Sequence, residues 1–131
     1  MSEFRWPVRV YWEDTDAGGV VYHASYVRYF ERGRSEWLRT LGWSQAQLAE
    51  EQKVLFSVVN LQIHYHSPAR LDDLLEVVTL PRMAGGASLQ FDQQLQREGE
   101  VLTTGTVLVA CVDAASFKPR RLPAAFRTRI A

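Results

Sequence analysis

An acidic, glycine-containing segment near the start of the chain carries the residue types needed to attack a carbonyl group. Residues 13–23 read Glu-Asp-Thr-Asp-Ala-Gly-Gly-Val-Val-Tyr-His; they follow an apolar, β-prone run and precede a long aromatic pattern of helical period. A carboxylate on such a turn can act as a base or a nucleophile. The helix start that follows offers unpaired backbone N–H groups and a partial positive charge. Together these groups could attack a carbonyl and stabilise the resulting oxyanion.

Asp16 and His23 are the candidate reactive residues of this segment. Asp16 would act as a general base on water or attack directly to form a mixed anhydride. Asp14 and Asp16 could equally be turn residues, because Asp favours turns and N-caps. His23 could be an ordinary first-turn residue with an exposed ring, so its backbone N–H is a stronger candidate than its imidazole.

Composition limits the class of protein. The chain has 131 residues, 47% hydrophobic and 23% charged, which suits a single globular domain over residues 1–131. A formal net charge of zero argues against a nucleic-acid binder. The single cysteine, Cys111, excludes an internal disulfide. The sequence shows no signal peptide and no apolar stretch of ~20 residues, so we expect a cytoplasmic protein with no integral membrane segment.

The periodicity predicts an α+β fold in which a strand meander wraps around one long helix. Gly33 interrupts the bulky stripe of that helix, which suggests close contact with the sheet. Such a sheet has open edges, and edge-to-edge pairing in a dimer would protect them. We expect the last strand to be central and the basic, Pro-broken tail from Phe117 to be solvated. The expected elements are a strand over residues 6–13, a helix over 23–41, a short helix from Ser44 to about 52, and strands over 54–66, 74–83, 88–97 and 101–113.

Two further groups of residues have ordinary structural explanations. His64 and His66 could be metal ligands on one strand face, but no third ligand is grouped with them, which favours plain polar positions. Cys111 lies in an apolar strand and is expected to be a small core residue rather than a nucleophile.

The segment from Val10 to Tyr26 also resembles a known family signature. From Asp16 onwards it fits the pattern Asp-x-x-Gly-x-Val-x-(His or Tyr)-x-x-Tyr. This is similar to the hotdog-fold acyl-CoA thioesterases of the 4-hydroxybenzoyl-CoA thioesterase type, and particularly to the bacterial branch encoded beside the Tol–Pal envelope genes. Residues 4–10, 67–73 and 118–120 agree with that branch, so the resemblance covers essentially the whole chain.

The resemblance implies a hotdog fold, with a five-stranded antiparallel sheet wrapped around one long central helix. It implies a hydrolase that acts on acyl-CoA thioesters without a cofactor or metal, as a homo-oligomer (dimer or homotetramer) with active sites at the dimer interface. The family's catalytic acid falls on Asp16, and the residue whose backbone N–H polarises the thioester carbonyl falls on His23. Trp12 departs from the pattern, because this branch commonly has Tyr there.

The resemblance also suggests partners and leaves alternatives open. For some members of this branch, the resemblance implies links to acyl carrier protein and to phospholipid-synthesis enzymes, and a peripheral position at the inner membrane. A non-catalytic acyl-binding or scaffolding protein beside Tol–Pal or acyl carrier protein is one alternative, and a hotdog dehydratase is another. Basic residues that could meet CoA phosphates, each equally explained as a surface charge, are Arg70, Arg82, Lys118, Arg120 and Arg121.

Overall fold

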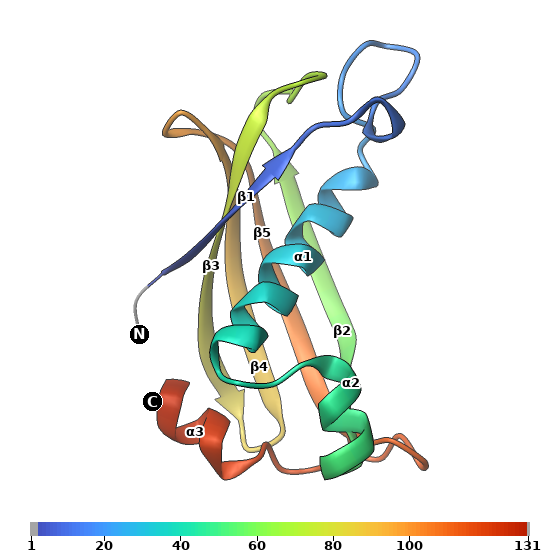
Figure 1. The fold of residues 1–131 in the computed structure, drawn as a ribbon, viewed down its shortest axis with the longest axis vertical. Coiled ribbons are helices and arrows are strands. Elements are labelled where there is room, and N and C mark those ends of the chain that lie inside the picture. The colour runs from blue at the N-terminus through green and yellow to red at the C-terminus, as the bar shows by residue number, and fades with distance from the viewer. Residues whose placement is uncertain (1–2, 131) are drawn as a thin grey trace.

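A five-stranded antiparallel sheet curls around one long helix in a computed structural model that describes residues 3–130 (Figure 1). The strand order is β1-β3-β4-β5-β2, so β1 and β2 form the two edges. This arrangement is the one expected from the sequence. The strands are β1 (Phe4–Arg9), β2 (Val54–Tyr65), β3 (Leu74–Gly85), β4 (Ser88–Arg97) and β5 (Glu100–Asp113), and the helices are α1 (Ser25–Thr40), α2 (Gln45–Gln47) and α3 (Ala124–Ile130), with a 3₁₀ turn η1 (Trp12–Asp14) and a π-helical turn η2 (Leu48–Gln52).

Helix α1 packs the predicted aromatic stripe against the sheet. Tyr26, Phe30 and Trp37 are buried on it. The close approach expected at Gly33 is confirmed, because a Cβ there would lie 2.5 Å from Val77 Cγ1. At this point the side chains of the sheet therefore pack directly against the helix backbone, with no room for a Cβ.

The first strand ends four residues earlier than predicted, at Arg9 instead of Glu13. The carboxylate of Asp14 accepts a hydrogen bond of 2.8 Å from the Tyr11 N–H and so caps η1. Such a side-chain bond offers the backbone an alternative to the strand ladder. Trp12 therefore lies in η1 instead of the predicted strand, and it is 82% exposed.

The β4–β5 hairpin is confirmed, with Glu98 and Gly99 at its turn and both at positive φ (49° and 84°). Strand β5 is interior, as expected from its apolar faces, but the middle strand of the sheet is β4.

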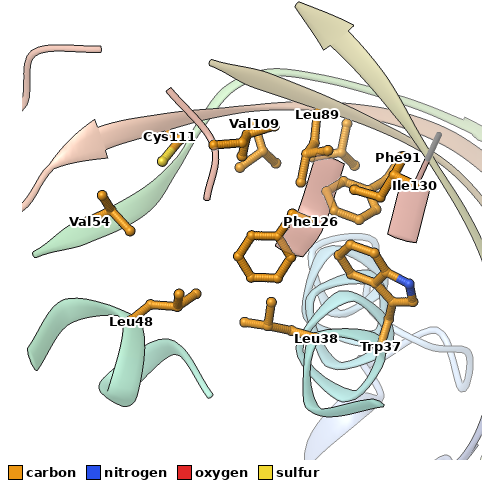
Figure 2. Packing of buried hydrophobic residues seen from close by; sticks show 12 residues of the cluster. Trp37, Leu38, Leu48, Val54, Leu89, Phe91, Val109, Cys111, Phe126 and Ile130 are labelled. Carbon is orange, nitrogen blue, oxygen red and sulfur yellow. The ribbon is translucent and has the colours of Figure 1, made fainter. Parts of the chain in front are cut away.

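The prediction of a solvated C-terminal tail is wrong. The tail turns back and forms α3, whose Phe126 and Ile130 are buried. Figure 2 shows Phe126 between Leu38 of α1 and the sheet residue Leu89. Cys111 lies in the same cluster, as the sequence predicted. The tail thus closes the end of the core opposite the start of α1 (Figure 1).

The edge strand β2 leaves apolar side chains in solvent. Val58 and Leu61 are 50% and 39% exposed. Their strand partners on β5 are the core residues Val109 and Val107, and directly paired residues share a sheet face. Residues 3–130 therefore leave Val58 and Leu61 on the inner face of β2 partly uncovered, although Phe56 and Ile63 of the same strand pack against the core.

Candidate active site

The acidic segment forms a tight loop between η1 and α1, and Asp16 lies at its turn. The Asp16 N–H donates to the Val20 carbonyl and the Gly19 N–H donates to the Asp16 carbonyl, both at 3.0 Å. Gly19 has φ 77°, a left-handed conformation that glycine adopts without strain. The Gly18 N–H donates to Asp16 Oδ1 at 2.8 Å, so one carboxylate oxygen is held by the loop. The Asp16 residue is exposed and open to a reactant.

Backbone hydrogen bonds tie this loop to the rest of the fold. The Val21 N–H donates to the Ala69 carbonyl at 2.9 Å, and the Tyr22 N–H donates to the Asp14 carbonyl at 2.8 Å. Asp14 is buried and caps η1, which fits the structural role expected for it. The loop is therefore fixed at its base, while its acid projects outward.

The helix start, residues 22–25, presents backbone donors without acceptors. The Ser25 N–H is used, since it donates to the Tyr22 carbonyl at 2.8 Å. The residue before α1, Ala24, has no capping side chain. Within residues 3–130, the N–H groups of His23 and Ala24 have no hydrogen-bond acceptor. Such orphan N–H groups at a helix N-terminus attract negative charge.

A small open pocket of about 260 Å³ lies beside this helix start. Its volume is just below the ~300–1,000 Å³ of typical ligand sites. The pocket is lined by Val21, His23, Tyr26, Tyr65, His66, Ser67 and Pro68. His23 is thus a wall of the pocket, while Asp16 is not among its lining residues.

Asp16 is nevertheless electrostatically close to the pocket. Burial raises the pKa of Tyr26, and the negative charge of Asp16 is one of the smaller contributions in the same direction. The Tyr26 hydroxyl accepts a hydrogen bond of 3.1 Å from the Ala69 N–H. The fold therefore brings Asp16 and His23 to one end of α1 on a single loop.

Tyr65 and His66 are pocket residues that the sequence did not single out for this site. The Tyr65 hydroxyl donates a hydrogen bond of 2.8 Å to the His23 carbonyl oxygen. His66 Nε2 lies 3.0 Å from Thr104 Oγ1. Both residues belong to the strand predicted over residues 54–66, and no sequence signal gives the contact of Tyr65 with a helix start 42 residues earlier.

Most of the other candidates lie outside this pocket, although Arg70 pairs with Val20 of the loop through an isolated β-bridge. Among residues 3–130, no group of three or more His, Cys, Asp or Glu side chains is arranged to hold a metal ion. Two of the five basic candidates are paired, Arg82 with Asp92 and Arg120 with Asp113. No helix in the described part of the chain is long and apolar enough to cross a membrane.

The chain is similar over nearly its whole length to proteins named as acyl-CoA thioesterases. It is 52% identical over 120 residues to the acyl-CoA thioesterase YbgC of Haemophilus influenzae, covering 92% of this chain and 88% of that protein. It is 53% identical over 121 residues to the acyl-CoA thioester hydrolase YbgC of Escherichia coli O6:H1, covering 92% and 90%.

A solved structure with lower sequence identity shares the fold. The 1,4-dihydroxy-2-naphthoyl-CoA thioesterase Slr0204 from Synechocystis superposes with a TM-score of 0.92 at 22% identity, covering 98% of this chain and 96% of that one. The predicted hotdog fold is thereby confirmed. Residues 10–130 match the thioesterase-like superfamily, and the chain belongs to that family.

Proposed function

We propose that this chain hydrolyses acyl-CoA thioesters to a free acid and CoA, with Asp16 and the helix start as its reactive groups. The observation that carries the proposal is one loop with a carboxylate at its turn and acceptor-free N–H groups, those of His23 and Ala24, at its end. The substrate class follows the relatives, which are named as acyl-CoA thioesterases at 52% and 53% identity.

The thioester carbonyl would accept hydrogen bonds from the helix start, where negative charge develops as the carbonyl is attacked. In one route Asp16 takes a proton from water, and the resulting hydroxide forms the new C–O bond. In the other, Asp16 attacks and an acyl-Asp anhydride is then hydrolysed by water. In both routes the C–S bond breaks and CoA leaves as a thiolate, which is a good leaving group. Apart from the reacting water, both routes use groups of the protein only.

The two routes can be distinguished by whether Asp16 becomes covalently acylated during turnover. An acyl mass attached to the Asp16 peptide, detected by mass spectrometry of enzyme quenched during turnover, is expected only for nucleophilic attack. The general-base route leaves the peptide unmodified throughout turnover.

The proposed assembly is a homodimer that pairs along β2, with a tetramer as the next level. The exposed inner residues Val58 and Leu61 lack a cover, and an edge strand presents unpaired N–H and C=O groups. A second copy paired there would continue the sheet and cover both. The pocket, whose wall includes Tyr65 of the same strand, would then be closed by the partner subunit.

The proposal also covers where the protein is located and which proteins it binds. A cytoplasmic position, peripheral at the inner membrane, and an acyl carrier protein partner fit the exposed basic residues Lys118, Arg121 and Arg129. Acyl carrier protein thioesters are a second substrate form to try. A role in envelope or phospholipid metabolism rests on the family resemblance alone.

The test is thiol release from a panel of acyl-CoAs, from short to long chains with one aromatic acyl group, by wild type and by Asp16→Asn. The variant keeps the shape of the side chain and removes the base, so kcat/KM should fall by at least about 10². Asp72→Asn is the matched control, because Asp72 is exposed and its side chain makes no hydrogen bond within residues 3–130.

The proposal fails if folded wild type releases no thiol from CoA or acyl carrier protein thioesters. Acyl binding without hydrolysis then becomes the better explanation of the pocket. If wild type is active and Asp16→Asn retains its rate, hydrolysis stands and the role of Asp16 does not.

A further inference from the structure

Tyr65 connects the edge strand to the helix start. It is the last residue of β2, and its hydroxyl donates to the His23 carbonyl oxygen at 2.8 Å. It is the side chain that holds the peptide between His23 and Ala24 from outside the loop.

Because a peptide group is planar, the hydrogen bond from Tyr65 to the His23 carbonyl also affects the N–H of Ala24. The carbonyl of His23 and the N–H of Ala24 belong to one rigid plane and point in opposite directions. A hydrogen bond that fixes the carbonyl oxygen therefore also fixes the direction of the Ala24 N–H. This N–H has no acceptor within residues 3–130.

The preceding peptide is fixed in the same way. The His23 N–H shares a plane with the Tyr22 carbonyl, which accepts the Ser25 N–H at 2.8 Å. Two consecutive peptides are thus anchored through their oxygens, one by the helix itself and one by Tyr65. Within residues 3–130, neither of the two N–H groups has an acceptor.

Tyr65 is itself held in place. Its ring packs edge-on against Tyr26, with the centroids 5.2 Å apart and the planes at 72°. The Tyr26 hydroxyl is tied to the Ala69 N–H at 3.1 Å. Burial raises the pKa of Tyr65, so the hydroxyl stays protonated and able to donate at neutral pH.

We propose that Tyr65 is a positioning residue, which aims the Ala24 N–H so that it and the His23 N–H form a two-donor oxyanion site. The inference rests on the proposed thioesterase function and assigns its second donor. A hydrogen bond to the carbonyl also polarises the peptide and strengthens its N–H as a donor, by about 10–30% per bond in linked chains.

The kinetic test is Tyr65→Phe, which removes only the hydroxyl. Loss of one oxyanion donor costs about 10²–10³ in kcat, and a donor that is present but misaimed should cost less, about tenfold. KM should change little. Tyr29→Phe is the matched control, because it also removes a single tyrosine hydroxyl, one that is near the Asp14 carboxylate but makes no hydrogen bond of normal geometry within residues 3–130.

A binding control separates positioning from pocket shape. An S-alkyl-CoA thioether has the acyl chain but no carbonyl, so it makes no demand on the oxyanion site. Its affinity should be the same for wild type and Tyr65→Phe. Equal losses of kcat and thioether affinity would show a pocket-wall role and overturn the proposal.

A spectroscopic test needs no turnover. His23-Ala24 is the only His-Ala pair in the sequence. Protein labelled with ¹³C′-His and ¹⁵N-Ala therefore gives one HNCO peak, which reports the His23 carbonyl and the Ala24 N–H together. Tyr65→Phe should shift this peak, with the carbonyl carbon moving upfield, while Tyr29→Phe should leave it in place.

The outcomes separate the two proposals. If the wild type is inactive on every thioester, the proposed function is wrong, whether or not the HNCO peak shifts. An unmoved peak in Tyr65→Phe refutes the positioning role, as does a shifted peak with kcat within twofold of wild type.

Discussion

Gly33→Ala should destabilise the protein although alanine is the better helix former. The added Cβ would lie 2.5 Å from Val77 Cγ1, 2.9 Å from Thr79 Oγ1 and 3.2 Å from Gln93 Nε2. Val77 and Thr79 are fully buried and Gln93 is 1% exposed, so none can swing into solvent. The helix and the sheet must therefore move apart.

The expected change in the free energy of unfolding for Gly33→Ala is the balance of opposing contributions. Alanine gains about 1 kcal/mol over glycine in a helix interior. Overpacking in a dense core costs about 1–3 kcal/mol. The Gln93 amide also donates to the Phe30 carbonyl and to Thr79 Oγ1, both at 2.9 Å, and straining such a bond costs about 1 kcal/mol more. The net loss should be about 1–3 kcal/mol, with Tm lower by roughly 4–10 °C.

The assay is urea denaturation followed by tryptophan fluorescence, at one protein concentration for all variants. Gly85→Ala is the matched control, since a Cβ at Gly85 would have no atom within 4 Å. It should be neutral or stabilising by up to about 1 kcal/mol. If Gly33→Ala is as stable as Gly85→Ala, the contact between α1 and the sheet relaxes freely and the steric account is wrong.

Three other perturbations test separate parts of the structure. Phe126→Ala should cost about 3–5 kcal/mol by denaturation, because Phe126 is fully buried, whereas Phe117→Ala, at a residue 61% exposed, should change little. Hydrogen bonds from the Ser116 and Ala115 N–H groups and from Arg120 lower the pKa of Asp113 from 3.8. The stability that this gives is present above pH 3.8 and is lost as pH falls through the lower folded value, so Asp113→Asn should flatten the acid limb of a stability–pH curve, and an unchanged limb would contradict this. Leu61→Lys should shift the protein toward monomer in sedimentation and reduce thiol release, while Gln62→Lys, on the opposite face of β2, should do neither, and equal effects would argue against the β2 interface.

Side-chain period and glycine position were enough to predict most of the fold. The stripe of α1 repeats at helical spacing, and Gly33 marks the contact with the sheet. The predicted bounds of β4, residues 88–97, are those observed, because alternation is clean between two turns. These features depend on local pattern and burial, which sequence carries directly.

The two elements that were predicted wrongly, the end of β1 and the C-terminal tail, depend on contacts between particular residues. Strand β1 ends early because one carboxylate, that of Asp14, caps η1. The tail is packed although its composition is basic and Pro-broken. The signal that could have revealed α3 is the spacing of Leu122, Phe126 and Ile130 at four-residue intervals, all of them buried.

The candidate site likewise contains residues that the sequence could identify and one residue that it could not. Asp16 and His23 could be named because they lie seven residues apart on one loop with a glycine turn. Tyr65 could not, since its role depends on where the end of β2 lies relative to the start of α1. A strand pattern fixes the face of a side chain but not its neighbour across the layers.

Tyr65 links two parts of this chain that are left open, the edge strand β2 and the helix start. Among residues 3–130, Leu61 on the inner face of β2 is partly exposed, and the N–H groups of His23 and Ala24 at the helix start have no acceptors. Exposed apolar surface favours contact with a partner subunit, while N–H groups without acceptors at a helix start favour an anionic or carbonyl oxygen. Tyr65 belongs to both, because it ends the exposed strand and binds the His23 carbonyl. Assembly along β2 would therefore exclude water from the helix start and hold Tyr65 against it, so pairing of subunits and stabilisation of the oxyanion should be lost together.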